Sequence, residues 1–156
     1  MKTFTLERSQ LINAPIDIVW QFFSDPRNLR EITPTYMNFR VTSGPLPPEI
    51  FKGQLISYKV SPLFGIPLKW VTEIMDVVPQ TMFIDEQRQG PYKLWHHEHY
   101  FETRKEGVMM RDKVAYALPL GILGEWANSL FVIKQLDAIF EYRRQIVDKQ
   151  FNYNTV

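Results

Sequence analysis

The chain has 156 residues, enough for one domain with a sizeable core, and 45% of them are apolar, as is usual in globular proteins. Its 18 basic and 17 acidic residues are spread along the chain and leave a net charge of +1, so neither nucleic-acid binding nor binding to an anionic membrane is indicated. The sequence has no cysteine, which excludes disulfides and thiol chemistry and agrees with a cytoplasmic location.

A strand and two short helices are predicted at the start of the chain. The first residues are polar and charged, unlike a signal peptide, and the alternation that follows predicts a strand over residues 3–12. Pro15 is typical of a first helical turn, and the apolar residues after it recur on one helical face: Ile16, Val19, Trp20 and Phe23. Pro26 ends this helix, and Asp25 can cap a second short helix over residues 26–32.

The middle of the chain alternates between apolar and polar residues and is interrupted by proline and glycine turns, which is typical of strands. The predicted strands are residues 38–43, 53–61, 68–78, 81–89, 92–104 and 108–118. Because the turns are short, consecutive strands should pair as an antiparallel meander. No apolar run approaches the roughly 20 residues that a membrane span needs, so we expect none.

The longest predicted helix ends the chain, over residues 121–151. Its apolar residues recur at helical steps and form one stripe: Leu123, Trp126, Leu130, Ile133, Leu136, Phe140, Val147 and Phe151. Because most preceding elements are strands, the helix should bury this stripe on a sheet. Further apolar residues lie roughly opposite: Phe131, Val132, Ile139, Tyr142 and Ile146. We expect the short helices to cover the last three, and the alternative is a homodimer contact or a partner surface.

The resulting fold class is α+β, and its order of elements resembles the START-type helix-grip (SRPBCC) superfamily, which includes the polyketide cyclase/dehydrase-like proteins. The motifs that carry the resemblance are Ala14-Pro15 followed by Val19-Trp20 and Asp25-Pro26, Leu29 followed by Ile32-Thr33-Pro34, Gly90-Pro91 followed by Trp95-His96-His97-Glu98-His99, Leu118-Pro119, and Phe140 with Tyr142-Arg143. The resemblance covers nearly the whole chain, residues 1–156, as a single domain. It is most similar to the bacterial ligand-binding branch.

This resemblance implies a curved antiparallel sheet of about six to seven strands wrapped around the C-terminal helix, with two short helices after the first strand. It also implies a hydrophobic cavity between sheet and helix. Members of the superfamily bind lipids, hormones, polyketides or quinones, and only some of them are enzymes. The resemblance therefore specifies a fold without naming a ligand.

All three histidines lie close together, at positions 96, 97 and 99. Because side chains alternate along a strand, four residues share one face: Trp95, His97, His99 and Phe101. We take this face as the inward one because its ends are bulkier. His96 and Glu98 then point outward.

The two neighbouring strands each offer a matching face, with Phe83, Asp85 and Gln87 on the strand before and Asp112, Val114 and Tyr116 on the strand after. If the faces coincide, an apolar wall carries one polar cluster: Asp85, Gln87, His97, His99 and Asp112. A few convergent polar groups in an apolar pocket are what a small-molecule site needs. The alternative is that these residues lie on a wet outer face and bind nothing.

The histidines are open to two kinds of chemistry. Two histidines one residue apart, with carboxylates from a neighbouring strand, could bind a metal ion. This spacing is common by chance, however, and we predict neither a tightly held structural metal nor a cofactor. General acid–base catalysis would use His97 or His99 with Asp85 or Asp112. The sequence has no nucleophile-elbow motif and no glycine-rich phosphate loop.

We therefore predict a cytoplasmic protein that binds a small hydrophobic ligand (a lipid, quinone, polyketide or similar molecule) between the sheet and the C-terminal helix. The predicted ligand-binding residues are Tyr58, Trp70, Phe83, Asp85, Gln87, Trp95, His97, His99, Phe101, Asp112, Val114, Tyr116, Leu130 and Ile133. The first alternative is an enzyme of the cyclase, dehydratase or isomerase kind. The second is a carrier that delivers its ligand to another protein.

Overall fold

The computed structural model describes residues 1–62 and 65–153. The N-terminal part contains strand β1 (Phe4–Ile12), helix α1 (Ile16–Phe23) and the short 3₁₀ helices η1 (Pro26–Arg30) and η2 (Thr35–Met37). The remaining strands are β2 (Arg40–Val41), β3 (Leu55–Val60), β4 (Leu68–Val78), β5 (Met82–Gln89), β6 (Leu94–Arg104) and β7 (Gly107–Ala117). The chain then continues through α2 (Ile122–Ala127), η3 (Asn128–Val132), α3 (Ile133–Val147) and η4 (Asp148–Asn152).

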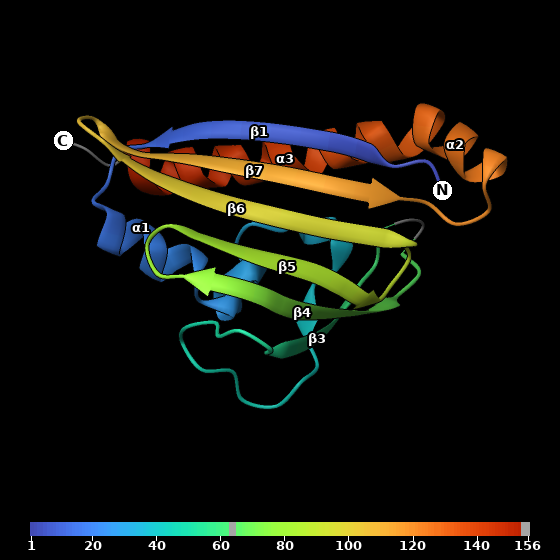
Figure 1. The fold of residues 1–156 in the computed structure, drawn as a ribbon, viewed down its shortest axis with the longest axis horizontal. Coiled ribbons are helices and arrows are strands. Elements are labelled where there is room, and N and C mark those ends of the chain that lie inside the picture. Colours follow the sequence, from blue (N-terminus) through green and yellow to red (C-terminus); the bar gives the residue numbers. More distant parts are fainter. Residues whose placement is uncertain (63–64, 154–156) are drawn as a thin grey trace.

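The seven strands form one antiparallel sheet in the order β1-β7-β6-β5-β4-β3-β2. Strands β2 to β7 follow one another as the predicted meander, and β1 pairs with the last of them. The register of β4 on β5 shifts near Thr72 and again near Asp76, and such irregularities bend a strand. In Figure 1, α3 runs along β1 and β7 while β3 to β5 curve away from it. The fold is the α+β helix-grip arrangement that the sequence predicts.

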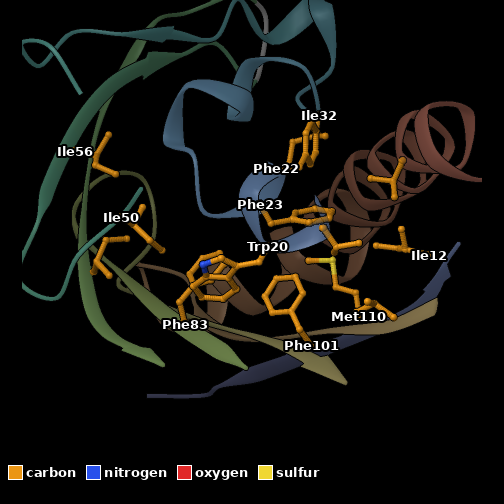
Figure 2. Packing of buried hydrophobic residues seen from close by; sticks show 14 residues of the cluster. Ile12, Trp20, Phe22, Phe23, Ile32, Ile50, Ile56, Phe83, Phe101 and Met110 are labelled. Carbon is orange, nitrogen blue, oxygen red and sulfur yellow. The ribbon is translucent and has the colours of Figure 1, made fainter. Parts of the chain in front are cut away.

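Helix α1 fills one end of the space between the sheet and the long helix. Its buried face carries Trp20, whose ring forms T-shaped contacts with the rings of Phe83 and Phe101 at 6.0 and 5.4 Å between centroids. Figure 2 shows these rings gathered between α1 and the sheet. Pro26 follows the end of α1, and the Asp25 carboxylate accepts a hydrogen bond from the backbone N–H of Arg27. The predicted second short helix is thus a capped 3₁₀ turn.

The C-terminal helical segment runs without a break from Ile122 to Asn152, but η3 and η4 within it are π-helical. The prediction that its whole apolar stripe is buried is wrong for the first half. Leu136, Phe140 and Val147 are buried. Four others are exposed, by 70%, 70%, 57% and 42% respectively: Leu123, Trp126, Leu130 and Ile133.

The π-helical turn η3 explains this error. Its hydrogen bonds span five residues instead of four, so the positions that face the sheet change phase. The buried positions are Gly124, before the turn, and Asn128, its first residue. A Cβ at Gly124 would collide with the carbonyl oxygen of Pro119, and the amide oxygen of Asn128 accepts a hydrogen bond from the Tyr116 hydroxyl at 2.7 Å. Gly124 and Asn128 therefore occupy the sheet-facing positions, where the apolar stripe predicted large apolar residues.

Of the residues expected on the opposite side of this helix, Ile146 is partly buried and packs against the main hydrophobic core, and Phe131 is 65% exposed. Ile139 lines the pocket between the helix and the sheet. Within residues 1–62 and 65–153, none of these helices is sufficiently long and apolar to traverse a lipid bilayer.

Candidate functional site

A pocket of about 590 Å³ lies between the curved part of the sheet and the C-terminal helix. Most of its lining is apolar. The sheet contributes Ile56, Tyr58, Trp70, Ile74, Phe83 and Trp95, and the helix contributes Ala127, Val132, Leu136, Ile139 and Phe140. The 3₁₀ segment and the turn before α2 complete it, with Leu29, Ile32 and Leu118 among their lining residues. The bend of the sheet away from α3 leaves room here that side chains do not fill.

Strand register brings a polar cluster to the wall of this pocket. Asp85 of β5 lies opposite His97 of β6, and His99 of β6 lies opposite Asp112 of β7. His97 and His99 are 5% and 4% exposed, so the face that we took as inward is the buried one. Asp85, His97 and His99 line the pocket, whereas Asp112 lies behind them.

The two aspartates contact the histidines from two sides. Nε2 of His99 lies 2.7 Å from Oδ2 of Asp85, and Nε2 of His97 lies 2.8 Å from Oδ1 of Asp112. Nδ1 of His99 is 3.1 Å from that same Oδ1 of Asp112, but its N–H direction does not align for a hydrogen bond. Nδ1 of His97 faces Oδ2 of Asp85 at 4.0 Å. Each histidine thus has one nitrogen near Asp85 and the other near Asp112.

Aromatic stacking and one cation complete the cluster. The ring of His99 stacks between those of Phe83 and His97, with centroid distances of 3.9 and 3.7 Å. Arg143, from α3, lies over the ring of Phe140 at 5.9 Å and reaches within 3.9 Å of Asp112 Oδ1. Its side chain is only 14% exposed and borders the pocket. The stack fixes the imidazole planes, and Arg143 places a positive charge beside them.

Burial disfavours the charged form of every ionisable group in this cluster. For His99, Asp85 and Asp112, oppositely charged neighbours outweigh this effect on the pKa. Burial, together with the neighbouring His99, lowers the pKa of His97. Burial also acts to lower the pKa of His99, but the two nearby carboxylates outweigh it and raise that pKa. Burial acts to raise the pKa of Asp112, yet Arg143 and the histidines hold it well below its usual range. The pKa of Asp85 is lowered in the same way, chiefly by His99. The two carboxylates therefore favour the charged form of His99, whereas burial favours the neutral form of His97.

The structure places seven of the predicted ligand-binding residues in the pocket wall: Tyr58, Trp70, Phe83, Asp85, Trp95, His97 and His99. Three others lie in the packed interior: Phe101 in the main core, and Val114 and Tyr116 under α3. Gln87 instead hydrogen-bonds the backbone of Tyr92, and Asp112 sits behind the histidines. Leu130 and Ile133 are exposed because of the change of phase at η3. Whether the seven residues bind a ligand remains a prediction.

Sequence reasoning missed two polar features of the pocket. Arg143 was named only as part of a family motif, because a charged residue on a helix is usually exposed to solvent. The sequence signal that could have identified it is its position three residues after Phe140, which places both residues on one face of the helix. Thr72 was also missed. Its hydroxyl lies 3.3 Å from the Tyr58 hydroxyl and accepts a hydrogen bond from the Trp70 indole N–H at 3.1 Å. These contacts orient two aromatic side chains of the wall.

The cluster also has the composition of a metal site. Asp85, His97 and His99 each offer one ligand atom, and these three atoms lie within 4.8 Å of one another. Nitrogen and carboxylate oxygen are the donors that zinc and other first-row transition metals accept.

Comparison with known proteins supports the fold. No protein-family model matches the chain, and no curated protein matches it. An aromatase/cyclase from Streptomyces sp. R1128 has a similar structure, with a TM-score of 0.74 and 13% identity over 96% of this chain and 93% of that one. A Chromobacterium violaceum protein gives a TM-score of 0.71 at 11% identity, covering 95% and 97% of the two chains. An uncharacterised Rhizobium leguminosarum protein gives 0.65 at 15% identity, covering 95% and 96%. These likenesses show a shared helix-grip fold.

Proposed function

We propose that this protein binds one small hydrophobic molecule, such as a lipid, quinone or polyketide, in the pocket between the sheet and the long helix. The observation that carries the proposal is a pocket of about 590 Å³, mostly apolar, with a buried polar cluster in its wall. Small-molecule sites typically enclose roughly 300–1,000 Å³ and combine an apolar lining with a few placed polar groups. Both the size and the distribution of polarity therefore fit.

In this proposal the polar end of the ligand lies against His97 and His99. Both imidazoles are buried and line the pocket, and Asp85 is the third polar group beside them. An imidazole donates a hydrogen bond to a ligand carbonyl or accepts one from a hydroxyl, depending on its protonation. The apolar body of the ligand would contact the rest of the wall, including Trp70 and Ile139. Burial of that body supplies most of the affinity, and the cluster supplies orientation.

Native mass spectrometry of freshly purified protein tests this proposal directly. We expect a bound molecule of small mass that is lost when the protein is denatured. Recovery of ligand-free protein from several hosts, together with no binding of lipids or quinones in titrations, would argue against it.

Two double variants test which face of strand β6 contacts the polar end of the ligand. In the first, His97→Ala is combined with His99→Ala; in the control, His96→Ala is combined with Glu98→Ala on the outer face, where His96 contacts Glu86 and Glu98. Loss of one hydrogen bond typically costs about 0.5–1.5 kcal/mol, a few-fold to about tenfold in affinity, so the first pair should lose at least that. If the control loses affinity while the first pair retains it, the assignment of the polar end is wrong.

A second candidate is an enzyme of the cyclase, dehydratase or isomerase kind. The observation that favours it is that each histidine in the pocket wall has a carboxylate within hydrogen-bond distance, at 2.7 Å for His99 and 2.8 Å for His97. A histidine held by a carboxylate is a common general acid or base. Turnover of an aromatic polyketide-like compound, abolished by His97→Ala or His99→Ala, would support the enzyme. Co-purification of a ligand without turnover would support binding or transport.

A further inference from the structure

We propose that Asp85, His97 and His99 form a binding site for a divalent transition-metal ion that is open to the pocket. The spacing of the two histidines did not justify this inference from the sequence. The structure adds Asp85 as the third donor and gives the distances between the donors. It also places the carboxylate of Asp112 beside the second nitrogen of each ring.

The donor atoms have nearly the separations that one ion requires. Oδ2 of Asp85 lies 2.7 Å from Nε2 of His99 and 4.0 Å from Nδ1 of His97, and the three donor atoms all lie within 4.8 Å of one another. An ion with bonds of about 2.0–2.2 Å holds its ligand atoms about 3–4 Å apart. Small side-chain rotations would therefore bring the three groups around one ion, and the Nε2 proton of His99 would be released to solvent.

Asp112 is placed as a supporting carboxylate for both histidines. It accepts a hydrogen bond from Nε2 of His97 at 2.8 Å, which leaves Nδ1 of that ring free to coordinate. It also lies 3.1 Å from Nδ1 of His99, a buried nitrogen that lacks an aligned hydrogen-bond partner. A slight rotation of His99 on binding the ion would align that contact. Metal-ligating histidines usually donate their second N–H to a carboxylate or carbonyl in this manner.

The charges around the site also suit a divalent cation. With both imidazoles neutral, Asp85 and Asp112 carry two negative charges and the nearby Arg143 carries one positive charge. A divalent ion leaves the group with one positive charge, which an anionic oxygen of a pocket ligand can balance. Two nitrogens and one carboxylate favour Zn²⁺, Fe²⁺ or Co²⁺ over Ca²⁺ and Mg²⁺, which prefer oxygen ligands.

The position of the cluster distinguishes this site from a closed structural one. All three proposed ligands line the pocket, so the coordination positions that they leave vacant face its interior. Three protein ligands with open positions are typical of metal sites that bind or activate a small molecule. The ion would act there as a Lewis acid toward an oxygen of the molecule in the pocket.

Titration of chelator-treated protein with Co²⁺ alone tests the proposal, with visible absorption and calorimetry as readouts. We expect one Co²⁺ per chain, displaced by Zn²⁺, and loss of binding when His97→Ala is combined with His99→Ala. Asp112→Asn should weaken binding by about 10–100-fold, because it removes the charge behind the rings. The control pair, His96→Ala with Glu98→Ala, removes a histidine and a carboxylate from the outer face and should bind Co²⁺ like the parent.

Folding of each variant is checked by circular dichroism and by its melting temperature. Asp85→Asn, which is nearly isosteric, replaces the double histidine variant if that variant does not fold, and it too should weaken Co²⁺ binding. The proposal is overturned if the parent takes up no Co²⁺, or if uptake persists in the folded pocket variants. Because the probe is the ion alone, a negative result leaves the binding of a hydrophobic molecule to be decided separately.

Discussion

Two aspartates flank His99 from opposite sides, Asp85 at Nε2 and Asp112 near Nδ1, and a guanidinium nitrogen of Arg143 lies 3.9 Å from Asp112 Oδ1. Every member of this group is largely buried, so each depends on the others for compensation of its charge. Deleting one member leaves a buried charge less well paired. The hydrogen bonds and charges in this group therefore affect the stability of the fold in addition to the binding of a ligand.

The first prediction compares Arg143 with its neighbour Arg144. Arg143→Met keeps an unbranched side chain against Phe140 but removes the cation beside Asp112. We expect the free energy of unfolding to fall by about 1–3 kcal/mol. Arg144→Met removes a cation that is 48% exposed and paired with Glu141, which should cost less than about 1 kcal/mol. Urea unfolding of both variants measures the difference, and equal losses would contradict the buried role of Arg143.

The second prediction concerns pH and the cap of η1. Hydrogen bonds from Arg27 hold the pKa of the Asp25 carboxyl below its ordinary value of 3.8. Its contribution to stability is therefore fully present above that ordinary value and is lost as the pH falls through the lower, folded-state pKa. Asp25→Asn should melt below the parent at pH 6, and the gap should narrow toward pH 3. A gap that stays constant over this range would show that the charge of Asp25 does not contribute.

At the scale of the element, the C-terminal helix shows how a local change of geometry redistributes burial. The π-helical turn over Asn128–Val132 separates α2, whose large apolar residues are exposed, from α3, whose Leu136 and Phe140 are buried. Helix α3 therefore contributes the fully buried apolar residues of this segment, and Val132 and Phe151 on either side of it are partly buried against the cores. The exposed residues before the turn include Leu123 and Trp126, and Leu130 within the turn is also exposed.

The third prediction follows from this division and uses two positions one turn apart. Leu136 is 3% exposed, whereas Ile133 is 42% exposed. Leu136→Asp would bury a carboxylate among apolar side chains and should cost several kcal/mol or prevent folding. Ile133→Asp should change the free energy of unfolding by about 1 kcal/mol or less, because its charge can remain in water. Thermal and urea unfolding compare them, and equal destabilisation would mean that the helix is rotated from the phase described above.

The strands show what the sequence does determine. The strand predicted over residues 68–78 coincides with β4, because alternation and a bounding proline act locally and are visible in the chain. Alternation also groups the residues that share one face of a strand, but it does not say what covers that face. For this reason His97 and His99 reach the pocket, whereas Val114 and Tyr116, on a matching face of β7, lie under α3. The phase of the long helix could not be predicted, because a π-helical turn has no distinct hydrophobic period.

For the whole molecule, the curvature of the sheet decides where side chains pack and where a pocket remains. Strands β1 and β7 stay close to α3 and share a small core with it, which includes Leu6, Val114 and Phe140. Strands β3 to β5 bend away from α3 (Figure 1). Residues of these three strands line the pocket. An apolar pocket of about 590 Å³ lacks the contacts that packed atoms would make, so a molecule bound there should stabilise the fold.

The last prediction tests this reasoning with two tryptophan substitutions on the same helix. Ile139 is half-buried and lines the pocket, whereas Ile133 is exposed and lies outside it. Ile139→Trp should occupy part of the pocket, weaken binding of a fluorescent apolar probe such as anilinonaphthalene sulfonate by at least tenfold, and leave the melting temperature unchanged or higher, because added contacts replace empty space. Ile133→Trp should bind the probe like the parent protein. If both variants retain full probe binding, the probe occupies another surface; if Ile139→Trp strongly lowers the melting temperature, the space beside Ile139 is already filled.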